Sequence, residues 1–228
     1  MKEQDYWKAF WTQGNILKQS DPQLRVGRSK MGEPIQKELW DETLRFLADQ
    51  LDLQEGDRLL DIGAGSGMIS IPFSHRVNRV VAADFSAALL STYAHYENIQ
   101  TLVTDIREQQ FDQASFSKVI IYFALQHFSE SETIRLFRAI YQWLEPGGIF
   151  YCGDIPDVTR KFLFYNNGER KKAYFDAIAK DKPILGNWFH KEFFNELGED
   201  IGFSSVIVSD QPTSFYNAHY RFDVKFVK

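Results

Sequence analysis

The sequence predicts an α/β protein with a doubly wound sheet of about seven strands, mostly parallel, with an antiparallel C-terminal strand and helices on both faces. Three observations predict this fold. Short buried strands alternate with amphipathic helices between residues 34 and 152. A glycine-rich turn directly follows the first strand. Residues 220–227 alternate between apolar and polar, which is typical of a strand with one exposed face.

Length and composition limit the class of protein. The 228 residues fit a single domain spanning 1–228, and a 44% hydrophobic content is enough for a sizeable core. The net charge of −5 disfavours binding to a long nucleic acid, although a local basic patch would still permit it. The single cysteine, Cys152, excludes an internal disulfide and a cysteine-based zinc site. Without a leader or a run of about 20 apolar residues, we expect a cytoplasmic protein with no membrane partner.

The first helix is predicted from Pro34 to Leu51, where apolar residues recur at helical spacing. Pro34 suits the first turn of a helix, because its missing N–H would have no partner there. A polar turn at 54–57 follows, and residues 58–62 (RLLDI) form a short buried strand. The glycine-rich turn then opens a second helix, which Pro72 is expected to kink.

The second strand is predicted at residues 79–83 and ends in an acid, Asp84. Ser86 can cap the helix that follows, which we extend to about Tyr96. This strand is adjacent to the first in a parallel sheet, so Asp84 is expected near the glycine turn.

Three further strands continue the alternation. They are predicted at residues 99–103, 118–123 and 149–152. Asp105 follows the first of them. Ser129 and Glu132 have the spacing of a capping box, which predicts the start of the helix that precedes the strand at 149–152.

Residues 155–187 interrupt this rhythm with many charged and aromatic side chains. We interpret them as an insertion of one or two helices that caps the substrate pocket. The N-terminal segment 1–33 is expected to close over the same site. After the insertion, a helix is predicted at 189–197 and a strand at 205–208.

The segment Asp61-Ile-Gly63-Ala-Gly65-Ser-Gly67 lies at the carboxyl end of the first strand, the edge where open α/β sheets bind ligands. A dinucleotide site has the spacing Gly-x-Gly-x-x-Gly, but Met68 stands where its third glycine would be. Asp61 also precedes the first glycine by two residues. Its carboxylate would repel a pyrophosphate and suits the ammonium group of a methionine moiety, so the spacing favours S-adenosylmethionine.

These residues resemble motif I of the class I S-adenosylmethionine-dependent methyltransferases, a Rossmann-like family. The segments FSKVIIYFALQHF at 116–128 and LEPGG at 144–148 are similar to two further motifs of that family, so the resemblance covers about residues 56–153. It implies that Asp84 binds the ribose hydroxyls and Asp105 the adenine amino group. It also implies that Arg28 holds the cofactor's carboxylate, although a run of basic residues is more often a solvated surface. The cofactor-binding residues that we predict are Asp61, Gly63, Ala64, Gly65, Gly67, Asp84, Phe85, Asp105, Ile106, Tyr122 and Arg28.

His127 lies just past the fourth strand, where donor and acceptor should meet. With an ordinary pKa near ~6.5, a histidine can accept a proton from a hydroxyl or amine, which makes His127 the candidate general base. Alternatively, it shapes the pocket and transfers no proton, because methyl transfer can rely on positioning. No pair of histidines or carboxylates has metal-ligand spacing, so no metal is predicted.

The surroundings of His127 most resemble the small-molecule enzymes of quinone-biosynthesis type. The resemblance therefore implies methyl transfer to an O or N atom of a small-molecule substrate, with S-adenosyl-L-methionine as cofactor. Two alternatives remain open: an NAD-dependent oxidoreductase on a related fold, and a relative that binds the cofactor without catalysis. The sequence does not predict the oligomeric state.

Overall fold

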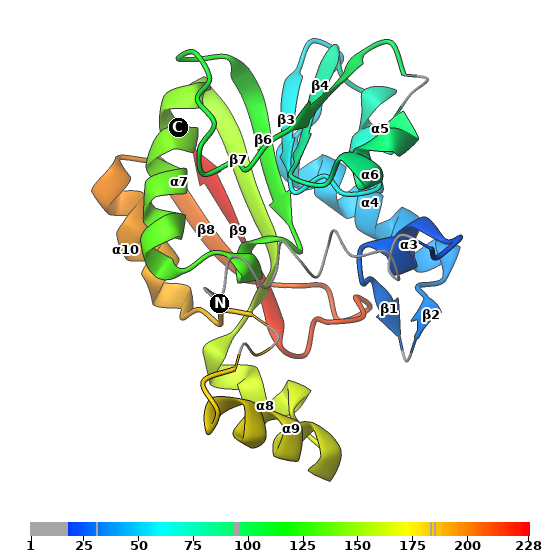
Figure 1. The fold of residues 1–228 in the computed structure, drawn as a ribbon. Coiled ribbons are helices and arrows are strands. Elements are labelled where there is room, and N and C mark those ends of the chain that lie inside the picture. Colours follow the sequence, from blue (N-terminus) through cyan, green and yellow to red (C-terminus); the bar gives the residue numbers. More distant parts are fainter. Residues whose placement is uncertain (1–17, 31, 94–95, 183, 185) are drawn as a thin grey trace.

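Seven strands form one twisted sheet in the order β5-β4-β3-β6-β7-β9-β8 (Figure 1). The computed structural model describes residues 18–30, 32–93, 96–182, 184 and 186–228. The strands are β3 (Arg58–Ile62), β4 (Arg79–Asp84), β5 (Ile99–Val103), β6 (Phe116–Tyr122), β7 (Leu144–Pro156), β8 (Ser205–Asp210) and β9 (Arg221–Val227). The contacts among β3 to β7 are parallel, and β9 runs antiparallel to both of its neighbours. The predicted fold class is confirmed.

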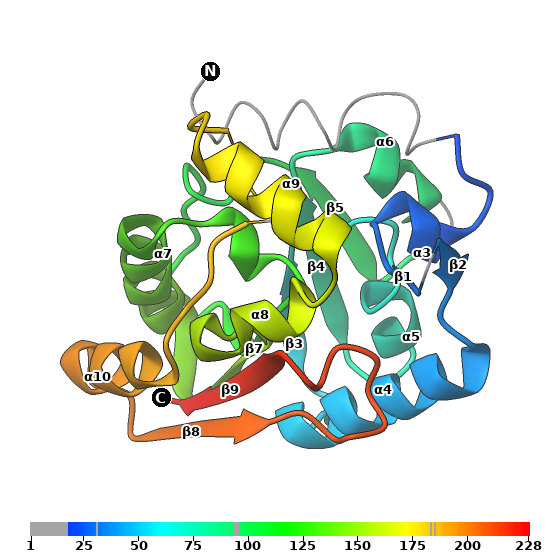
Figure 2. The ribbon, with the colours of Figure 1, turned by 90° about the horizontal axis from the view of Figure 1, so that it is seen from below.

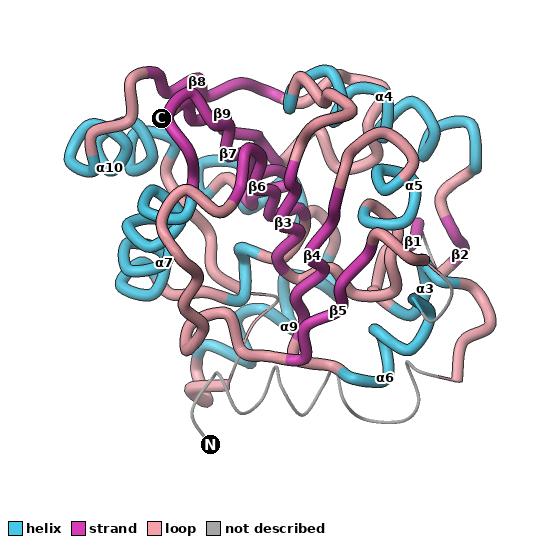
Figure 3. The backbone as a smooth tube through the Cα atoms, turned by 90° about the horizontal axis from the view of Figure 1, so that it is seen from above, coloured by secondary structure: helices cyan, strands magenta, loops and turns pink. Residues whose placement is uncertain are grey.

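Helices cover both faces of this sheet. Figure 3 shows this from above, with the strands side by side in a row. Helices α7 (Glu130–Trp143) and α10 (Lys191–Ile201) pack on one face. Helices α4 (Lys37–Leu51), α5 (Ser70–Ser74) and α6 (Ala87–Leu90) pack on the other. Each face therefore has its own apolar core, which fixes the strand ends where the site is built.

The N-terminal ends of the first helices differ from the prediction. Helix α4 begins at Lys37, and Pro34 instead ends β2 (Glu33–Pro34), which pairs with β1 (Ser29–Lys30). Helix α5 has five residues, and Pro72 lies in its first turn, where a missing N–H breaks no helical bond. The predicted kink is therefore wrong.

Helix α6 also ends earlier than predicted. Ser86 caps it as expected, accepting a bond from the N–H of Leu89, but the helix stops at Leu90. A 3-10 turn over Ser91–Tyr93 replaces its continuation. The buried Tyr93 hydroxyl donates to the carbonyl of Ala64 at 3.2 Å, which draws this segment toward the glycine turn. The capping box of Ser129 and Glu132 at the start of α7 is present in full.

The alternating pattern predicted that one face of β9 is exposed to solvent. This prediction is wrong. Phe222 and Phe226 face the core of α7 and α10, but the polar positions Arg221 and Asp223 are also buried, at 1% and 0% exposure. Asp223 accepts hydrogen bonds from Tyr151, from the N–H of Asp154 and from Gln211. The second face is therefore covered as well, and it carries buried charge.

The insertion begins where β7 ends. It contains a 3-10 turn at Val158–Arg160, α8 (Lys161–Phe164) and α9 (Gly168–Ile178). These helices extend beyond the carboxyl edge of the sheet in Figure 1, and Figure 2 views them from that side. Within the described ranges, no helix is long and apolar enough to cross a bilayer.

Candidate functional site

The glycine turn after β3 follows a path that side chains would obstruct. Gly63 and Gly65 have φ values of +73° and +54°, a region that favours glycine. A Cβ at Gly63 would lie 2.7 Å from the Cβ of Ala124, and one at Gly65 would lie 2.7 Å from Cγ1 of Val26. The bare backbone therefore lets segments from two other parts of the chain approach the turn.

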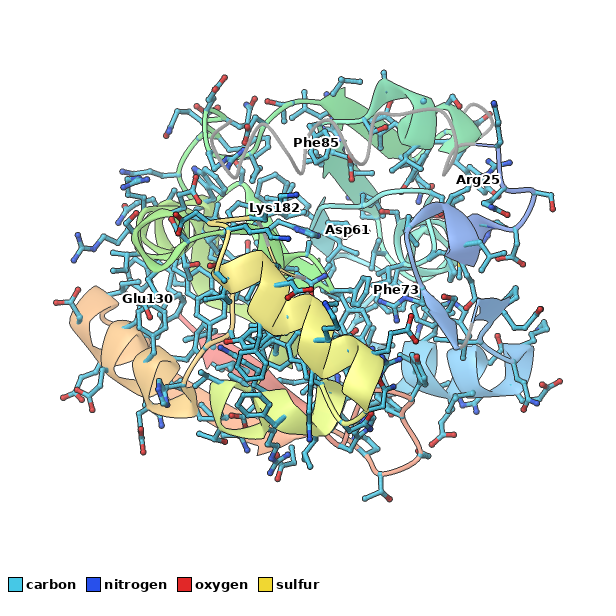
Figure 4. All side chains as sticks on the ribbon, turned by 60° about the horizontal axis from the view of Figure 1, so that its bottom comes forward. Arg25, Asp61, Phe73, Phe85, Glu130 and Lys182 are labelled. Carbon is cyan, nitrogen blue, oxygen red and sulfur yellow. The ribbon has the colours of Figure 1, made fainter. Side chains whose placement is uncertain are left out.

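A cavity that opens to solvent lies at this turn, beyond the carboxyl ends of β3, β4 and β6. Nine of the twelve predicted site residues line it: Arg28, Asp61, Gly63, Ala64, Gly65, Asp84, Phe85, Tyr122 and His127. Figure 4 shows Asp61 in the interior near the end of β3, whereas Arg25 lies at the periphery. The structure thus brings most of the predicted site together from segments up to about 100 residues apart.

Asp61 is the most deeply buried acid of this cavity, with 2% exposure. Its Oδ2 accepts a hydrogen bond from the hydroxyl of Ser70 at 2.6 Å. Burial raises the pKa of Asp61 to about 7, and the nearby Asp84 acts in the same direction. A cationic group in the cavity would relieve this cost by pairing with the carboxylate.

Asp84 is anchored by backbone groups. Its Oδ2 accepts from the N–H of Gly65 at 2.9 Å, and its Oδ1 accepts from the N–H of Ser86 at 2.8 Å. Burial raises the pKa of Asp84, although these hydrogen bonds oppose the shift. Each carboxylate oxygen has a second lone pair. These lone pairs can accept bonds from ligand hydroxyls.

Arg28 reaches the cavity from the N-terminal segment. Its guanidinium stacks over the rings of Trp40, Tyr122 and Phe123, with centroid distances of 4.6, 4.8 and 5.0 Å. It is 9% exposed, so it is not part of a solvated surface. Its Nη2 lies 3.9 Å from the carboxylate of Asp154, so an anionic ligand group would share this cation with Asp154.

The segment that carries Arg28 is tied to the rest of the protein. The hydroxyl of Ser66 donates to the carbonyl of Pro22 at 2.9 Å, and Gln23 exchanges two bonds with the backbone of Ile35. Asp21 caps the short helix α3 (Pro22–Arg25). Residues 18–30 therefore pack against the glycine turn, whereas residues 1–17 lie outside the described part.

His127 lines the cavity from the 3-10 turn at Leu125–His127, after β6. Burial lowers the pKa of His127 to about 4, and the nearby Arg221 cation contributes. The imidazole is therefore neutral near pH 7, and it is a weaker base than an exposed histidine.

Three predicted cofactor residues do not line this cavity. The carboxylate of Asp105 instead accepts bonds from Nε and Nη2 of Arg107 at 2.8 and 2.7 Å. Ile106 packs in the core under α7. Gly67 serves the turn itself, because a Cβ there would lie 2.5 Å from Cδ1 of Ile71. A role for Asp105 at the adenine stays a prediction, and it would require Arg107 to share the carboxylate.

Sequence reasoning missed several apolar walls of the cavity, namely Val26, Trp40, Met68, Ile69, Leu89, Phe123 and Ala124. Trp40 was expected only as part of the helical stripe. Phe123, predicted as the end of a strand, lies past β6 with φ of +63°. Such a positive φ at a bulky residue has no local sequence signal. In the described part of the chain, no three His, Cys, Asp or Glu residues are grouped so as to hold a metal.

The polar groups of this cavity fit one type of cofactor. Two buried acids, a buried arginine and the backbone of the glycine turn match a ligand that carries an ammonium, hydroxyls and a carboxylate. Residues 59–148 match the sequence model of a family described as a methyltransferase domain. Residues 59–148 therefore form a methyltransferase domain, as the resemblance to the class I S-adenosylmethionine-dependent methyltransferases implied.

Known relatives of this methyltransferase act on different molecules. A phosphoethanolamine N-methyltransferase from Arabidopsis thaliana is 22% identical over 201 residues, which are 86% of this chain and 38% of that protein. A demethylmenaquinone methyltransferase from Staphylococcus epidermidis is 27% identical over 154 residues, 64% of this chain and 60% of that protein. The methyltransferase spans only about a third of the length of the phosphoethanolamine enzymes that it matches.

Solved structures support the same fold. The magnesium protoporphyrin IX methyltransferase of Synechocystis PCC 6803, solved with S-adenosylmethionine, has a TM-score of 0.64 and 14% identity. That similarity covers 100% of this chain and 98% of the other. A phosphoethanolamine N-methyltransferase of Haemonchus contortus has a TM-score of 0.58 over 66% of this chain and 32% of its own. The predicted cofactor, S-adenosylmethionine, is thereby supported by family, fold and site chemistry.

Proposed function

We propose that this methyltransferase transfers a methyl group from S-adenosylmethionine to an O or N atom of a small molecule. The observation that carries the proposal is the cavity in which Asp61, Asp84 and the glycine turn face Tyr122 and His127. When bound, the cofactor supplies an activated methyl group. The protein then contributes binding, alignment and the exclusion of water.

Each charged residue of the cavity has a distinct role in this proposal. Asp61 pairs with the ammonium group, Asp84 accepts bonds from the ribose hydroxyls, and Arg28 faces the carboxylate. Phe85 follows Asp84 and lines the same wall, beside the nucleoside. His127 and Tyr122 line the same cavity from the end of β6 and the turn after it. In this proposal Tyr122 contacts the cofactor, and His127 positions the acceptor. Because burial makes its imidazole a weak base, we propose that His127 positions the acceptor and does not take its proton.

We further propose that two segments close the site of a single domain spanning 1–228. The anchoring of residues 18–30 on the glycine turn supports closure by the N-terminal segment 1–33. The place of α8 and α9 beyond the carboxyl edge supports the cap formed by 155–187. A cytoplasmic location is also proposed, in keeping with a single cysteine that is buried as a free thiol.

The test is transfer of a labelled methyl group. The protein is incubated with methyl-labelled S-adenosylmethionine and either phosphoethanolamine, whose acceptor atom is nitrogen, or a metabolite extract, and S-adenosylhomocysteine is measured. Formation of S-adenosylhomocysteine only when an acceptor is present supports the proposal. Tight cofactor binding without product from any of them would favour a binding protein, and NAD binding in its place would favour an oxidoreductase.

A further inference from the structure

Ser70, the first residue of α5, contacts Asp61 from outside the cofactor cavity. It is fully buried, and its hydroxyl donates a hydrogen bond to Oδ2 of Asp61 at 2.6 Å. Asp61 lines the cofactor cavity, but Ser70 does not. Any effect of Ser70 on a ligand is therefore exerted through this carboxylate. The bond occupies Oδ2 and leaves Oδ1 of Asp61 for a group in the cavity.

The acid and the phenols around Asp61 do not offset its negative charge. Asp84, at the end of β4, adds to the burial that raises the pKa of Asp61. Burial and the Asp61 carboxylate raise the pKa of Tyr93, and burial raises the pKa of Tyr122, so both phenols stay neutral. These three groups therefore supply no positive charge to Asp61.

The basic side chains of the cavity do not supply it either. Nη2 of Arg28 lies 3.9 Å from the carboxylate of Asp154, and the imidazole of His127 is neutral near pH 7. In the part of the chain that the structure describes, no lysine, arginine or histidine forms an ion pair with Asp61. Among these residues, the buried carboxylate therefore has no cationic partner before the cofactor binds.

Hydrogen bonds from Ser70 act in the opposite direction. Both its hydroxyl and its backbone N–H lower the pKa of Asp61, although burial has the larger effect. A hydroxyl that donates to a carboxylate over about 2.5–2.7 Å makes a charge-assisted bond, which is stronger than a bond between neutral groups. Because this bond is stronger to the carboxylate than to the neutral acid, Ser70 favours the ionised Asp61 that an ammonium group needs.

We propose that Ser70 is a positioning residue for the cofactor, because its hydroxyl keeps Asp61 charged and leaves Oδ1 to the ammonium group. The inference rests on the proposed function, in which Asp61 pairs with that group. It adds a residue that touches no ligand and whose removal changes the pH range over which the cofactor binds. A serine that only packs α5 against β3 would have no such effect.

The test compares wild type with Ser70→Ala by isothermal titration calorimetry between pH 6 and pH 8.5. One ligand is S-adenosylhomocysteine, which carries the ammonium group. The other is 5′-methylthioadenosine, which has the nucleoside and the sulfur but no ammonium group. Ser74→Ala is the matched control, because Ser74 is buried on the same helix and its hydroxyl donates to the carbonyl of Ile71. Ser70→Cys fills the site with a weaker donor, should Ser70→Ala fail to fold.

At pH 6, we expect Ser70→Ala to bind S-adenosylhomocysteine about 10–100-fold more weakly than wild type, the loss of one hydrogen bond to a charged group. At pH 8.5 the difference should fall below about fivefold, because Asp61 is ionised in wild type and increasingly so in the variant. Ser70→Cys should show the same trend at smaller amplitude. Ser74→Ala should match wild type at every pH, and all four proteins should bind 5′-methylthioadenosine alike.

Three results would overturn the inference. They are equal binding of S-adenosylhomocysteine by Ser70→Ala and wild type at pH 6, a loss of the same size at pH 6 and pH 8.5, or an equal loss for 5′-methylthioadenosine. Each would leave Ser70 with a packing role. Failure of wild type to bind either ligand would count against the proposed function itself, and the inference would fall with it.

Discussion

The backbone N–H of Gly65 donates to the carboxylate of Asp84 over 2.9 Å, which joins the turn after β3 to the end of β4. The second oxygen of Asp84 holds the N–H of Ser86, at the start of α6. One carboxylate thus connects the ends of β3 and β4 with the start of α6. Asp84 therefore both shapes the cavity and offers lone pairs to a ligand in it.

Asp84→Ala is expected to weaken binding of S-adenosylmethionine by about 1–3 kcal/mol, the range for hydrogen bonds to a charged group. Isothermal titration calorimetry measures the change. Asp84→Asn keeps one acceptor oxygen and should fall between wild type and Asp84→Ala. Wild-type affinity in Asp84→Ala would remove the ribose assignment.

Gly65→Val should abolish cofactor binding. The new side chain would collide with Val26, 2.7 Å from its Cβ, and the φ of +54° disfavours a β-branched residue. Gly56→Val is the control, because nothing lies within 4 Å of a Cβ there. If Gly65→Val folds and binds the cofactor as well as Gly56→Val does, the glycine turn is structural only.

Asp61→Asn should stabilise the free protein at high pH. The pKa of Asp61 is raised from 3.8 to about 7 by burial, so between those values the folded state holds a proton that the unfolded state has lost. The free energy of unfolding therefore falls as pH rises through this window. Urea unfolding should show Asp61→Asn more stable than wild type by about 1–3 kcal/mol at pH 8, and less so at pH 5. The exposed Asp112→Asn should show no such trend.

The same titration predicts the pH dependence of cofactor binding. The ammonium group favours the ionised carboxylate, so the affinity of wild type for S-adenosylmethionine should rise with pH up to about 7 and then level. Calorimetry in buffers of different ionisation enthalpy should detect proton release below that pH. Asp61→Asn should bind weakly at every pH, and a wild-type affinity in that variant would disprove the ammonium contact.

His127 should not produce a limb in the pH profile of kcat/KM between pH 6 and 8, because burial and Arg221 lower the pKa of its imidazole to about 4. His127→Gln should keep activity within about tenfold of wild type, since a general base contributes about 10²–10⁴-fold. A limb near pH 6.5 that disappears in His127→Gln would instead establish this residue as the base.

Local patterns predicted much of the site. The strands β3, β4 and β5 were placed within a residue of their ends, because each is a short apolar run bounded by turn residues. Asp61 and Asp84 follow from the same pattern, since the carboxyl ends of parallel strands share one edge. The same pattern predicted that Asp105 binds the cofactor at this edge. In the structure, however, the carboxylate of Asp105 accepts a hydrogen bond from the guanidinium of Arg107, two residues later.

By itself the sequence determined the succession of strands and helices along the chain, the glycine turn, the acids beside it and the capping box, because each depends on residues close together along the chain. Only the tertiary structure decided which charges are buried. An alternating pattern shows that a strand has two faces, but not whether distant segments cover both. Asp223 is buried because Tyr151 and Asp154, 72 and 69 residues earlier, donate to its carboxylate. Such a charge is tolerated inside a protein only when partners of this kind satisfy it.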